Sequence, residues 1–445
     1  MASYLYRNSP VPTSEKKFTF STWLKMSDAS TSADNGIVEW YKSSNERYQI
    51  LIDSATRQLR LYAVEAGAVK ATIYSNMVFR DMNGWYHIVI HSDTTQSSSS
   101  DRFKLWVNGV AQTFASYTWS YNQNANVNVF DGSGTRLNLG TRGEAYATWL
   151  NGYLADTYYI DGSLIAYTEF GETDNTTGGW KPNTEPTISS FGNAGVHLKY
   201  ENSGTIGLDS SGNTNNFTAS GTVTQTQDNP SHVFATLNPL HKGNTLTGFT
   251  FANGNNTFTA GSTSYPYTFS TLANSSGKYY AEFKTTANAN QIGIGISAGV
   301  KAAYIGHNQY DYAYYGLNGN IITNQTSNTT YGTGLSTNDI LGVAMDLDNN
   351  KLYFSVNGSW QNSANPSSGT GGFSITAPSS TTTGVYHFAL GDEASSTPSV
   401  QCNFGNGFFG TTAISSEGTN ASGNGKFEYD VPTGYTALST RGLNE

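Results

Sequence analysis

The chain has 445 residues, of which 12% are charged and 13% aromatic, and its formal net charge is −9. Its few Lys and Arg residues are scattered, so the sequence lacks the basic stripe that displaces phosphate counterions and argues against nucleic-acid binding. No stretch approaches the ~20 apolar residues of a membrane span, which argues against membrane insertion.

The composition favours strands over helices. The chain has 47 Gly, 29 Tyr and 22 Phe, so turn formers and β formers are common. Its one cysteine, Cys402, has no second thiol in the chain to pair with and is expected to be a small buried side chain. The first residues, MASYLYRNSPVP, have no apolar run of a signal peptide, so we expect synthesis in a cytoplasm.

The first 170 residues alternate apolar and polar side chains in short segments. Residues 18–26, FTFSTWLKM, predict a half-buried strand, and residues 84–92, GWYHIVIHS, predict a central strand with two largely apolar faces. Asn108-Gly109 and Asp161-Gly162 predict tight turns, because such pairs tolerate positive φ. Further strands are expected at 36–40, 48–52, 58–64, 71–75, 102–110, 136–139 and 150–160.

The pattern changes between residues 171 and 245. The run GETDNTTGGWKPNTEP is polar and rich in Gly and Pro, which indicates a loop, and residues 196–200 form a short strand-like segment. We interpret 171–245 as a connector that carries a few strands. The sequence leaves open whether it packs on the first region or stands apart.

A second alternating region covers residues 246–445. In QIGIGIS (291–297) Ile alternates with Gly, which predicts that a neighbouring backbone approaches closely. Asn357-Gly358 predicts another hairpin, and no segment has a 3.6-residue apolar period of helix length. We therefore predict an all-β chain of two sandwiches, at 1–170 and 246–445. Its further strands are expected at 279–283, 340–346, 351–356, 385–390 and 400–404.

Both regions resemble known families of two-sheet jelly rolls, which implies two concanavalin A-like jelly-roll β-sandwiches. The first region resembles laminin-G-like domains of the concanavalin A-like superfamily in FTFSTWLKM (18–26), GWYHIVIHSD (84–93), RFKLWVNGV (102–110), LNLG (137–140) and LNGYLADTYYIDG (150–162). The second region resembles SPRY domains in KYYAEFK (278–284), IGIGIS (292–297), YGTGLSTNDILGVAMDLDNNKLYFSVNGSW (331–360), YHFALGD (386–392) and VQCNFG (400–405).

The combination is similar to virion proteins of marine tailed phages, and so are HVFATLNPL (232–240) and DVPTGYTALSTRGL (430–443). This resemblance implies a tail-associated fibre or head-decorating protein, made in the host cytoplasm, that assembles as a homo-oligomer with other virion proteins. Two alternatives stay open. A bacterial surface lectin would need an export signal, and an intracellular SPRY-type scaffold would bind peptides.

The sequence predicts no catalysis. Glucanases of the concanavalin A-like fold resemble one another in a Glu-x-Asp-x-x-Glu strand, which this chain lacks. The nearest acidic groupings are Asp346/Asp348 and Asp392/Glu393, and no Gly-x-Ser-x-Gly elbow is present. His87 and His91 share a strand face but have no third metal ligand near them in sequence, which favours structural roles.

A turn rich in oxygen ligands suggests calcium. The run DSSGNTNN (209–216) resembles a turn of laminin-G-like repeats, with Asp209, Asn213 and Asn215 as the candidate ligands. The alternative is an Asx-rich turn without an ion.

The preferred ligand is a host surface glycan, because sugar rings stack on aromatic side chains and sugar hydroxyls pair with Asn and Asp. The run YIGHNQYDYAYYGLNGN (304–320) lies where SPRY domains carry binding loops. Tyr314 and Tyr315 are expected in the core, and loops at 40–47 and 128–136 are lesser candidates. The candidate glycan-binding residues are Tyr304, His307, Asn308, Tyr310, Asp311 and Tyr312.

Overall fold

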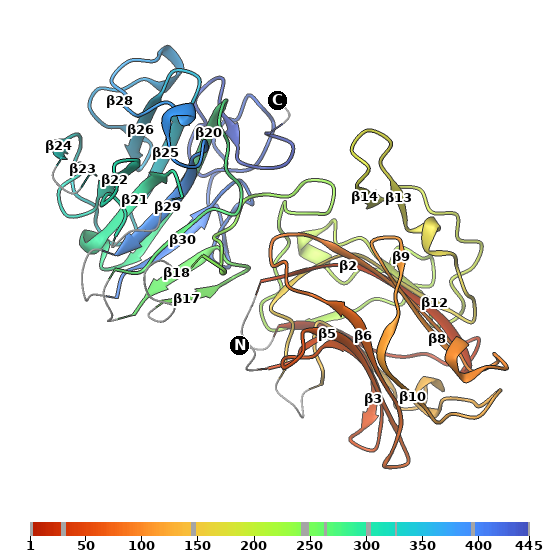
Figure 1. Cartoon of the computed structure of the whole chain (residues 1–445). Coiled ribbons are helices and arrows are strands. Elements are labelled where there is room, and N and C mark those ends of the chain that lie inside the picture. Colours follow the sequence, from red (N-terminus) through yellow and green to blue (C-terminus); the bar gives the residue numbers. More distant parts are fainter. Residues whose placement is uncertain are drawn as a thin grey trace. The chain divides into compact units, whose positions relative to one another are not determined.

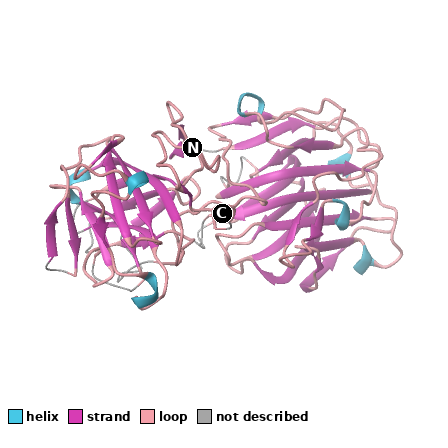
Figure 2. Cartoon of the chain, turned by 90° about the horizontal axis from the view of Figure 1, so that it is seen from above, coloured by secondary structure: helices cyan, strands magenta, loops and turns pink. Residues whose placement is uncertain are grey.

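The computed structural model describes residues 3–27, 33–143, 148–241, 249–261, 265–299, 304–324, 327–392 and 397–443. The chain divides into two compact units, Met1–Gln225 and Thr226–Glu445 (Figure 1). Strands and loops make up nearly all of it, with short 3-10 turns and no α-helix among the described residues (Figure 2). The predicted all-β fold is confirmed. No helix in the described ranges is long and apolar enough to cross a membrane.

Two antiparallel sheets enclose the core of the first unit. The β3 sheet has the strand order β10-β6-β5-β4-β3-β11-β1-β16, and the β2 sheet has the order β15-β12-β2-β7-β8-β9. Phe18 of the β2 sheet packs on Trp40 and Tyr48 of the β3 sheet, with ring centroids 4.9 and 5.9 Å apart. The strands are β1 (Tyr4–Asn8), β2 (Lys17–Met26), β3 (Asn35–Ser43), β4 (Glu46–Ile52), β5 (Gln58–Glu65), β6 (Ala68–Val78), β7 (Tyr86–Asp93), β8 (Phe103–Val107), β9 (Val110–Ala111), β10 (Phe114–Trp119), β11 (Arg136–Leu139), β12 (Gly152–Asp161), β13 (Gly171–Thr173), β14 (Trp180–Pro182), β15 (Val196–Leu198) and β16 (Thr218–Ser220).

Most of the predicted connector belongs to the first unit. β15 pairs with β12 and β16 pairs with β1, so this segment extends both sheets, and the boundary between the units falls after Gln225. The hairpin β13–β14 places the Trp180 ring over the β2 sheet, where its Nε1 donates to His87 Nδ1 at 2.9 Å. The sequence left open whether the segment 171–245 packs on the first region, and the structure assigns residues up to Gln225 to the first unit. These three-residue strands form ladder bonds with distant partners, which a local apolar pattern does not reveal.

Two of the three predicted turns form as expected. Asn108-Gly109 and Asn357-Gly358 both have positive φ and close the hairpins β8–β9 and β26–β27. Asp161-Gly162 does not close a hairpin, because the chain leaves the sheet there. The Asp161 carboxylate instead accepts hydrogen bonds from the backbone N–H groups of Thr13, Ser14 and Ala194.

The second unit is a sandwich of its own. The β20 sheet runs β17-β18-β30-β20-β25-β26-β27, and the β21 sheet runs β19-β29-β21-β22-β23-β24. Phe283 packs against Phe388 and Phe404 in the core, and Cys402 is buried there as predicted. The strands are β17 (Phe249–Ala252), β18 (Thr257–Ala260), β19 (Tyr267–Phe269), β20 (Lys278–Ala287), β21 (Ile292–Ser297), β22 (Asp311–Tyr315), β23 (Asn320–Thr323), β24 (Ser327–Thr330), β25 (Ile340–Asp346), β26 (Lys351–Val356), β27 (Ser359–Trp360), β28 (Phe373–Ser374), β29 (His387–Asp392), β30 (Ser399–Asn403), β31 (Phe408–Phe409), β32 (Thr412–Ala413) and β33 (Thr436–Ala437).

The segments 232–240 and 430–443, which the sequence analysis singled out, come from opposite ends of this unit and pair with each other. Phe234 forms a bridge with Ser439, and Ala235 N donates to Leu438 O at 2.9 Å. β33 also pairs in parallel with β20. These segments therefore close the second sandwich and serve its fold.

The anchoring role of Asp161 can be tested by substitution. Asp161→Ala leaves three backbone N–H groups without their acceptor, so we expect the first unit to lose about 3 kcal/mol of unfolding free energy. Urea unfolding followed by tryptophan fluorescence measures this, since Trp360 is the one tryptophan of the second unit. The control is Asp101→Ala, whose exposed pair with Lys104 should change stability by less than about 0.5 kcal/mol. Equal effects of the two substitutions would contradict the anchoring role.

Candidate functional site

Each sandwich has one outer sheet face that its own chain covers. In the first unit Val89 and Tyr158, on the outer side of the β2 sheet, pack with Phe170. In the second unit Tyr280 and Phe427 pack together on the outer side of the β20 sheet. The outer faces of the β3 sheet and the β21 sheet are covered only in part, since Glu39 on the first and Ala313 on the second are buried.

The structure removes Tyr312 from the predicted glycan site. Its side chain is 5% exposed and lies in the core, where its hydroxyl group bonds with Thr376 Oγ1 at 3.1 Å. The ring packs near Phe373 and Tyr386. Tyr312 and Tyr314 point inward because they are two residues apart on β22, and Tyr314 is in the core as predicted.

Asp311 is also inaccessible to a ligand, although it faces the outer side of β22. It is fully buried beneath the segment 304–310, and Ser297 Oγ donates to its carboxylate at 2.6 Å. Burial raises the pKa of Asp311 to about 6. The prediction failed here because the sequence does not show that residues 304–310 fold over this strand.

Tyr304 and His307 lie together at the surface of the second unit. Their ring centroids are 5.2 Å apart, and Tyr304 lies 5.5 Å from Tyr265, which is 38% exposed. The sequence reasoning missed Tyr265, although its position between polar residues and before Pro266 marks it as an aromatic side chain at a loop end. Tyr265 is exposed and Tyr304 and His307 are half-buried, and the three rings are here called the exposed aromatic cluster of the β21 sheet.

The remaining two predicted residues contribute less. Tyr310 is half-buried and packs against the core, and the backbone of Asn308 holds the loop by accepting hydrogen bonds from Asp311 N and Asn324 N at 3.2 and 3.1 Å. Tyr315, expected in the core, is half-buried on the outer side of β22. Asp311 and Tyr312 are therefore inaccessible to a ligand. The accessible aromatic neighbours of Tyr304 are Tyr265 and Tyr315.

A small pocket lies beside the exposed aromatic cluster. The strand registers align Tyr267, Gly391, Gly293 and Tyr315 in one row across β19, β29, β21 and β22. The two glycines leave room between the tyrosines, and Ile305 partly fills this room, since a Cβ on Gly293 would lie 2.8 Å from Ile305 Cγ2. The pocket is lined by Gly293, Tyr304, Ile305, Ala313, Tyr315, Ile322, Gly391 and Asp392.

The predicted calcium ligands come together in the first unit. The Asp209 carboxylate accepts hydrogen bonds from the backbone N–H groups of His197 and Asn215 at 3.0 and 2.8 Å. The amide groups of Asn213 and Asn215 both donate to Gly195 O, at 3.1 and 2.8 Å. These contacts are those of an Asx-rich turn that is bonded to β15, and calcium at this turn stays a prediction.

Calcium binding at this turn predicts a change in thermal stability. A ligand that binds the folded state alone raises its stability by mass action, so millimolar calcium should raise the Tm of the first unit relative to a chelator. Asp209→Asn should abolish this rise, whereas Asp101→Asn on the exposed surface should leave it unchanged. A calorimetric melt that is the same with calcium and with chelator would count against the site.

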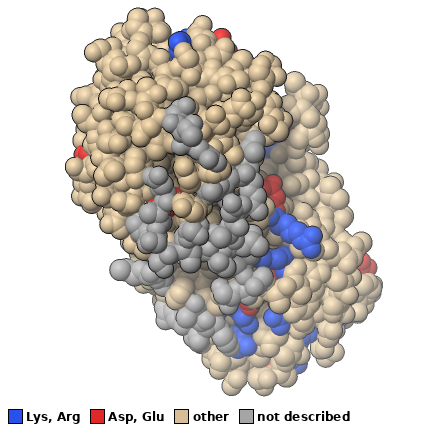
Figure 3. Space-filling view, turned by 60° about the vertical axis from the view of Figure 1, so that its left-hand side comes forward, with Lys and Arg blue, Asp and Glu red and all other residues tan. Residues whose placement is uncertain are grey.

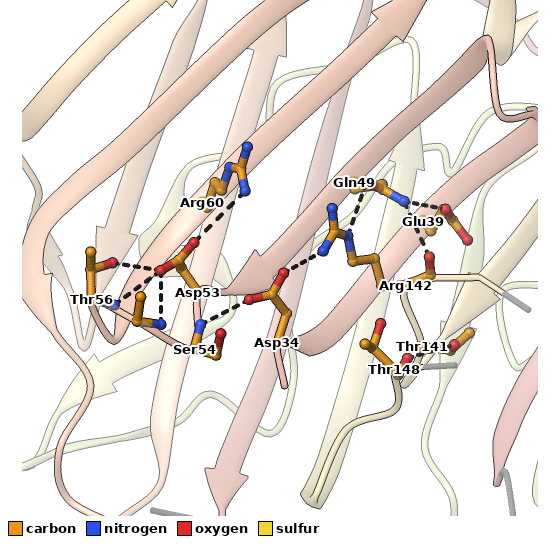
Figure 4. A network of polar contacts seen from close by, with 11 residues as sticks. Asp34, Glu39, Gln49, Asp53, Ser54, Thr56, Arg60, Thr141, Arg142 and Thr148 are labelled. Atoms are coloured by element: carbon orange, nitrogen blue, oxygen red, sulfur yellow. Dashed lines mark hydrogen bonds and ion pairs between the residues drawn. The ribbon is translucent and has the colours of Figure 1, made fainter. Parts of the chain in front are cut away.

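A network of polar side chains crosses one end of the β3 sheet (Figure 4). Gln49 Nε2 donates to Glu39 Oε1 at 2.5 Å and to Arg142 O at 3.2 Å, and Arg142 also pairs with Asp34. Asp53 accepts hydrogen bonds from the turn that follows β4 and lies 3.7 Å from Arg60. The network ties Arg142 to Gln49 of β4 and to Asp34.

Glu39 is the buried carboxyl of this network. It is fully buried, and its donors are the side-chain amides of Gln49 and Asn138. Burial raises the pKa of Glu39. Through Gln49 and Arg142 the network also includes the carboxyl of Asp34.

The acidic pairs that the sequence singled out have structural contacts. Asp346 pairs with Lys278 at 3.0 Å, and Asp348 accepts from Gly277 N at 2.7 Å. Asp392 lines the small pocket, and Glu393 lies outside the described residues. In the described ranges no three His, Cys, Asp or Glu residues are grouped as metal ligands.

The two histidines of β7 are held by neighbours from the segment beyond residue 160. His87 stacks on Trp23 with ring centroids 4.7 Å apart, and its Nδ1 accepts from Trp180 Nε1. Burial lowers the pKa of His87 to about 3, so the imidazole is neutral near pH 7. His91 Nε2 lies 2.7 Å from the carbonyl oxygen of Ile165. Both histidines therefore have the structural roles that the sequence favoured.

The buried Glu282 is expected to make the unfolding free energy of the second unit depend on pH. Its carboxylate accepts from Glu428 N and Tyr429 N at 2.9 and 2.8 Å, and burial raises its pKa to about 7. A carboxyl whose folded pKa is raised stabilises the fold below its unfolded pKa of 4.5, and this stability is lost as the pH rises through about 7. The unfolding free energy of this unit should therefore fall by roughly 3 kcal/mol between these pH values.

Calorimetry of the wild type and of Glu282→Gln across this pH range measures the effect. The substitution should flatten the pH dependence, and the slope that remains belongs in part to Asp311, whose raised pKa acts in the same direction. Glu417→Gln, at an exposed ion pair with Lys426, is the control and should keep the wild-type slope. An unchanged slope in Glu282→Gln would contradict the prediction.

Comparisons with known proteins agree with the fold of the first unit. Residues 2–164 match the family model described as the concanavalin A-like lectin/glucanases superfamily. The predicted concanavalin A-like, laminin-G-like domain is thus confirmed there, over well under half of the chain. A comparison with curated proteins found no match.

Solved structures that resemble the chain include the SPRY domain of human HERC1, at 16% identity over 37% of this chain and 96% of that chain, with a TM-score of 0.29. They also include a heptameric SAP-like pentraxin from Limulus polyphemus, at 15% identity over 37% of this chain and 72% of that chain, with a TM-score of 0.27. SPRY domains are therefore among the structural neighbours. At this sequence identity and TM-score, the likeness gives no information about the ligands of this chain.

Proposed function

We propose that this protein is a non-enzymatic binding protein that recognises carbohydrate on the outer face of the β21 sheet. The observation that carries the proposal is the exposed aromatic cluster of Tyr265, Tyr304 and His307 beside the small pocket. Tyrosine rings offer apolar faces to the C–H groups of a sugar, and their hydroxyl groups offer hydrogen bonds at the rim.

The rigid strands beneath the cluster support this role. Gly293 and Gly391 sit in fully paired strands below Tyr304, so the pocket floor is preorganised. The match of residues 2–164 to a family whose description includes lectins supports carbohydrate as the ligand class for the chain as a whole.

We place this binding protein on the surface of a tailed-phage particle, as a tail-associated or head-decorating component that contacts host glycans. The order of a laminin-G-like region and a SPRY-like region, and the segments 232–240 and 430–443, support this assignment by resemblance. Mass spectrometry of purified particles tests it. Detection of the chain only in the cell envelope would favour the surface lectin, and detection only in the cytoplasm would favour the peptide-binding scaffold.

Substitutions in the aromatic cluster test the glycan site. Tyr304→Ala and Tyr265→Ala each remove one stacking surface, and we expect each to weaken binding to the best ligand of a glycan array by about tenfold. The matched control is Tyr312→Phe, which keeps the buried ring and removes only a hydroxyl group, and it should bind like the wild type. Binding that survives Tyr304→Ala, or that is lost in Tyr312→Phe, would contradict the site.

A further inference from the structure

The strand β10, at one side of the β3 sheet, has backbone groups that no described strand pairs. In the strand order of this sheet β10 comes first and pairs with β6 alone. Ser120 N donates to Lys70 O at 2.7 Å, and ladder hydrogen bonds recur at every second residue of an antiparallel pair. Thr118 therefore also bonds with β6, whereas the N–H and C=O groups of Tyr117 and Trp119 point away from it.

β10 is the longest of the strands that end the four large sheets in the described part of the chain. It has six residues, whereas β16, β9, β15, β17, β27, β19 and β24 have two to four. Its sequence, FASYTW, has no charged residue and no proline, which are the residues that usually protect an edge from pairing with another chain. Its bulge lies at the start, between Phe114 and Ser116, so the rest of the strand is regular and open to a further strand.

The unpaired backbone groups of β10 suit pairing with a second copy of the same strand. If Tyr117 pairs with Trp119 of the second copy in antiparallel register, then Trp119 pairs with Tyr117 of that copy. This register satisfies all four outward N–H groups of the two strands at once. The two-fold axis then passes between the two Thr118 residues.

The same register matches the side chains on both faces of the strand. On the outer face the exposed Thr118 meets its own copy and the exposed Ser116 meets Ser120, and such hydroxyl pairs form hydrogen bonds across strands. On the inner face Tyr117 and Trp119 are half-buried at the rim of the first core, and each ring would cover the other in the second copy. The strand is therefore complementary to itself.

Charge does not oppose this association. β10 is uncharged, so no like charges meet across the axis. Charged residues make up only 12% of the whole chain, and most of the surface visible in Figure 3 has no charged side chain. Long-range repulsion between two copies is therefore weak at ordinary ionic strength.

We propose that two copies of this chain associate through β10, antiparallel about a two-fold axis at Thr118, and so join their β3 sheets into one continuous sheet. The occupant is a second copy because one neutral strand supplies matching hydroxyl pairs, ring pairs and hydrogen bonds on both sides of the axis. An interface of this symmetry is closed, so association ends at the dimer. It lies in the first unit and does not depend on the carbohydrate site proposed for the second unit.

Sedimentation velocity of the full chain across the micromolar range tests the proposal. The wild type should approach twice the mass of the chain, with no larger species, as the concentration rises. Thr118→Lys places two like charges at the axis and should raise the dissociation constant of the dimer at least about tenfold. The matched control is Ser359→Lys, which adds the same charge to an exposed position on the edge strand β27 and should dimerise like the wild type.

Complementary charges test the position of the axis. Thr118→Lys and Thr118→Glu should each be largely monomeric alone, because like charges then face each other. An equimolar mixture of the two variants should regain the dimer, because opposite charges then meet. Recovery on mixing also shows that both variants are folded.

A cross-link tests the register. The single thiol of the chain, Cys402, is buried, so an introduced thiol reports its own position. The two Thr118 Cα atoms should lie about 4.5 Å apart, within the span of a disulfide, so Thr118→Cys should form a covalent dimer on mild oxidation. The two Ser116 Cα atoms should lie about 14 Å apart, too far for a disulfide, so Ser116→Cys is the matched control.

Three results would overturn the proposal. A wild type that stays monomeric at high micromolar concentration would show that β10 is open or takes a strand of another protein. Dimerisation of Thr118→Lys equal to that of the wild type, or equal cross-linking of Thr118→Cys and Ser116→Cys, would place the contact elsewhere. Because Tyr304→Ala should leave the dimer intact, failure of this interface and failure of the carbohydrate site are distinguishable.

Discussion

Buried carboxylates that accept backbone N–H groups hold the irregular segments of this protein onto its sheets. Asp161 bonds with Thr13, Ser14 and Ala194, and Glu282 bonds with Glu428 and Tyr429. A sandwich buries the inner faces of its two sheets, while the outer faces need either polar side chains or a cover. These carboxylates fasten the covers, and so they decide which outer face of each sandwich stays accessible.

The two accessible faces differ in chemistry. On the β21 sheet glycines lie under Tyr304 and Tyr315, and an aromatic surface with little charge results. On the β3 sheet the outward positions carry arginines stacked on tyrosines around the buried Glu39.

Much of the fold could be predicted from local pattern. The alternation in 18–26 and 340–346 predicted strands that β2 and β25 confirm, and Asn108-Gly109 and Asn357-Gly358 predicted hairpins that form. The candidate site was harder to predict. Tyr312 was chosen as a ligand contact and lies in the core, while Tyr265, which the sequence reasoning passed over, lies next to Tyr304. The aromatic side chains of residues 304–312 stand at positions 304, 307, 310 and 312, and this irregular spacing does not distinguish inner from outer.

The sequence by itself determined the all-β class, the two sandwiches and most of the strands, because alternation of apolar and polar side chains and the turn propensity of Asn-Gly are local properties. Only the tertiary structure decided where the segment after residue 170 belongs and which faces are open. β15 and β16 join sheets whose other strands lie far away in the chain. Register between distant strands depends on long-range packing and hydrogen bonds, which no local pattern contains.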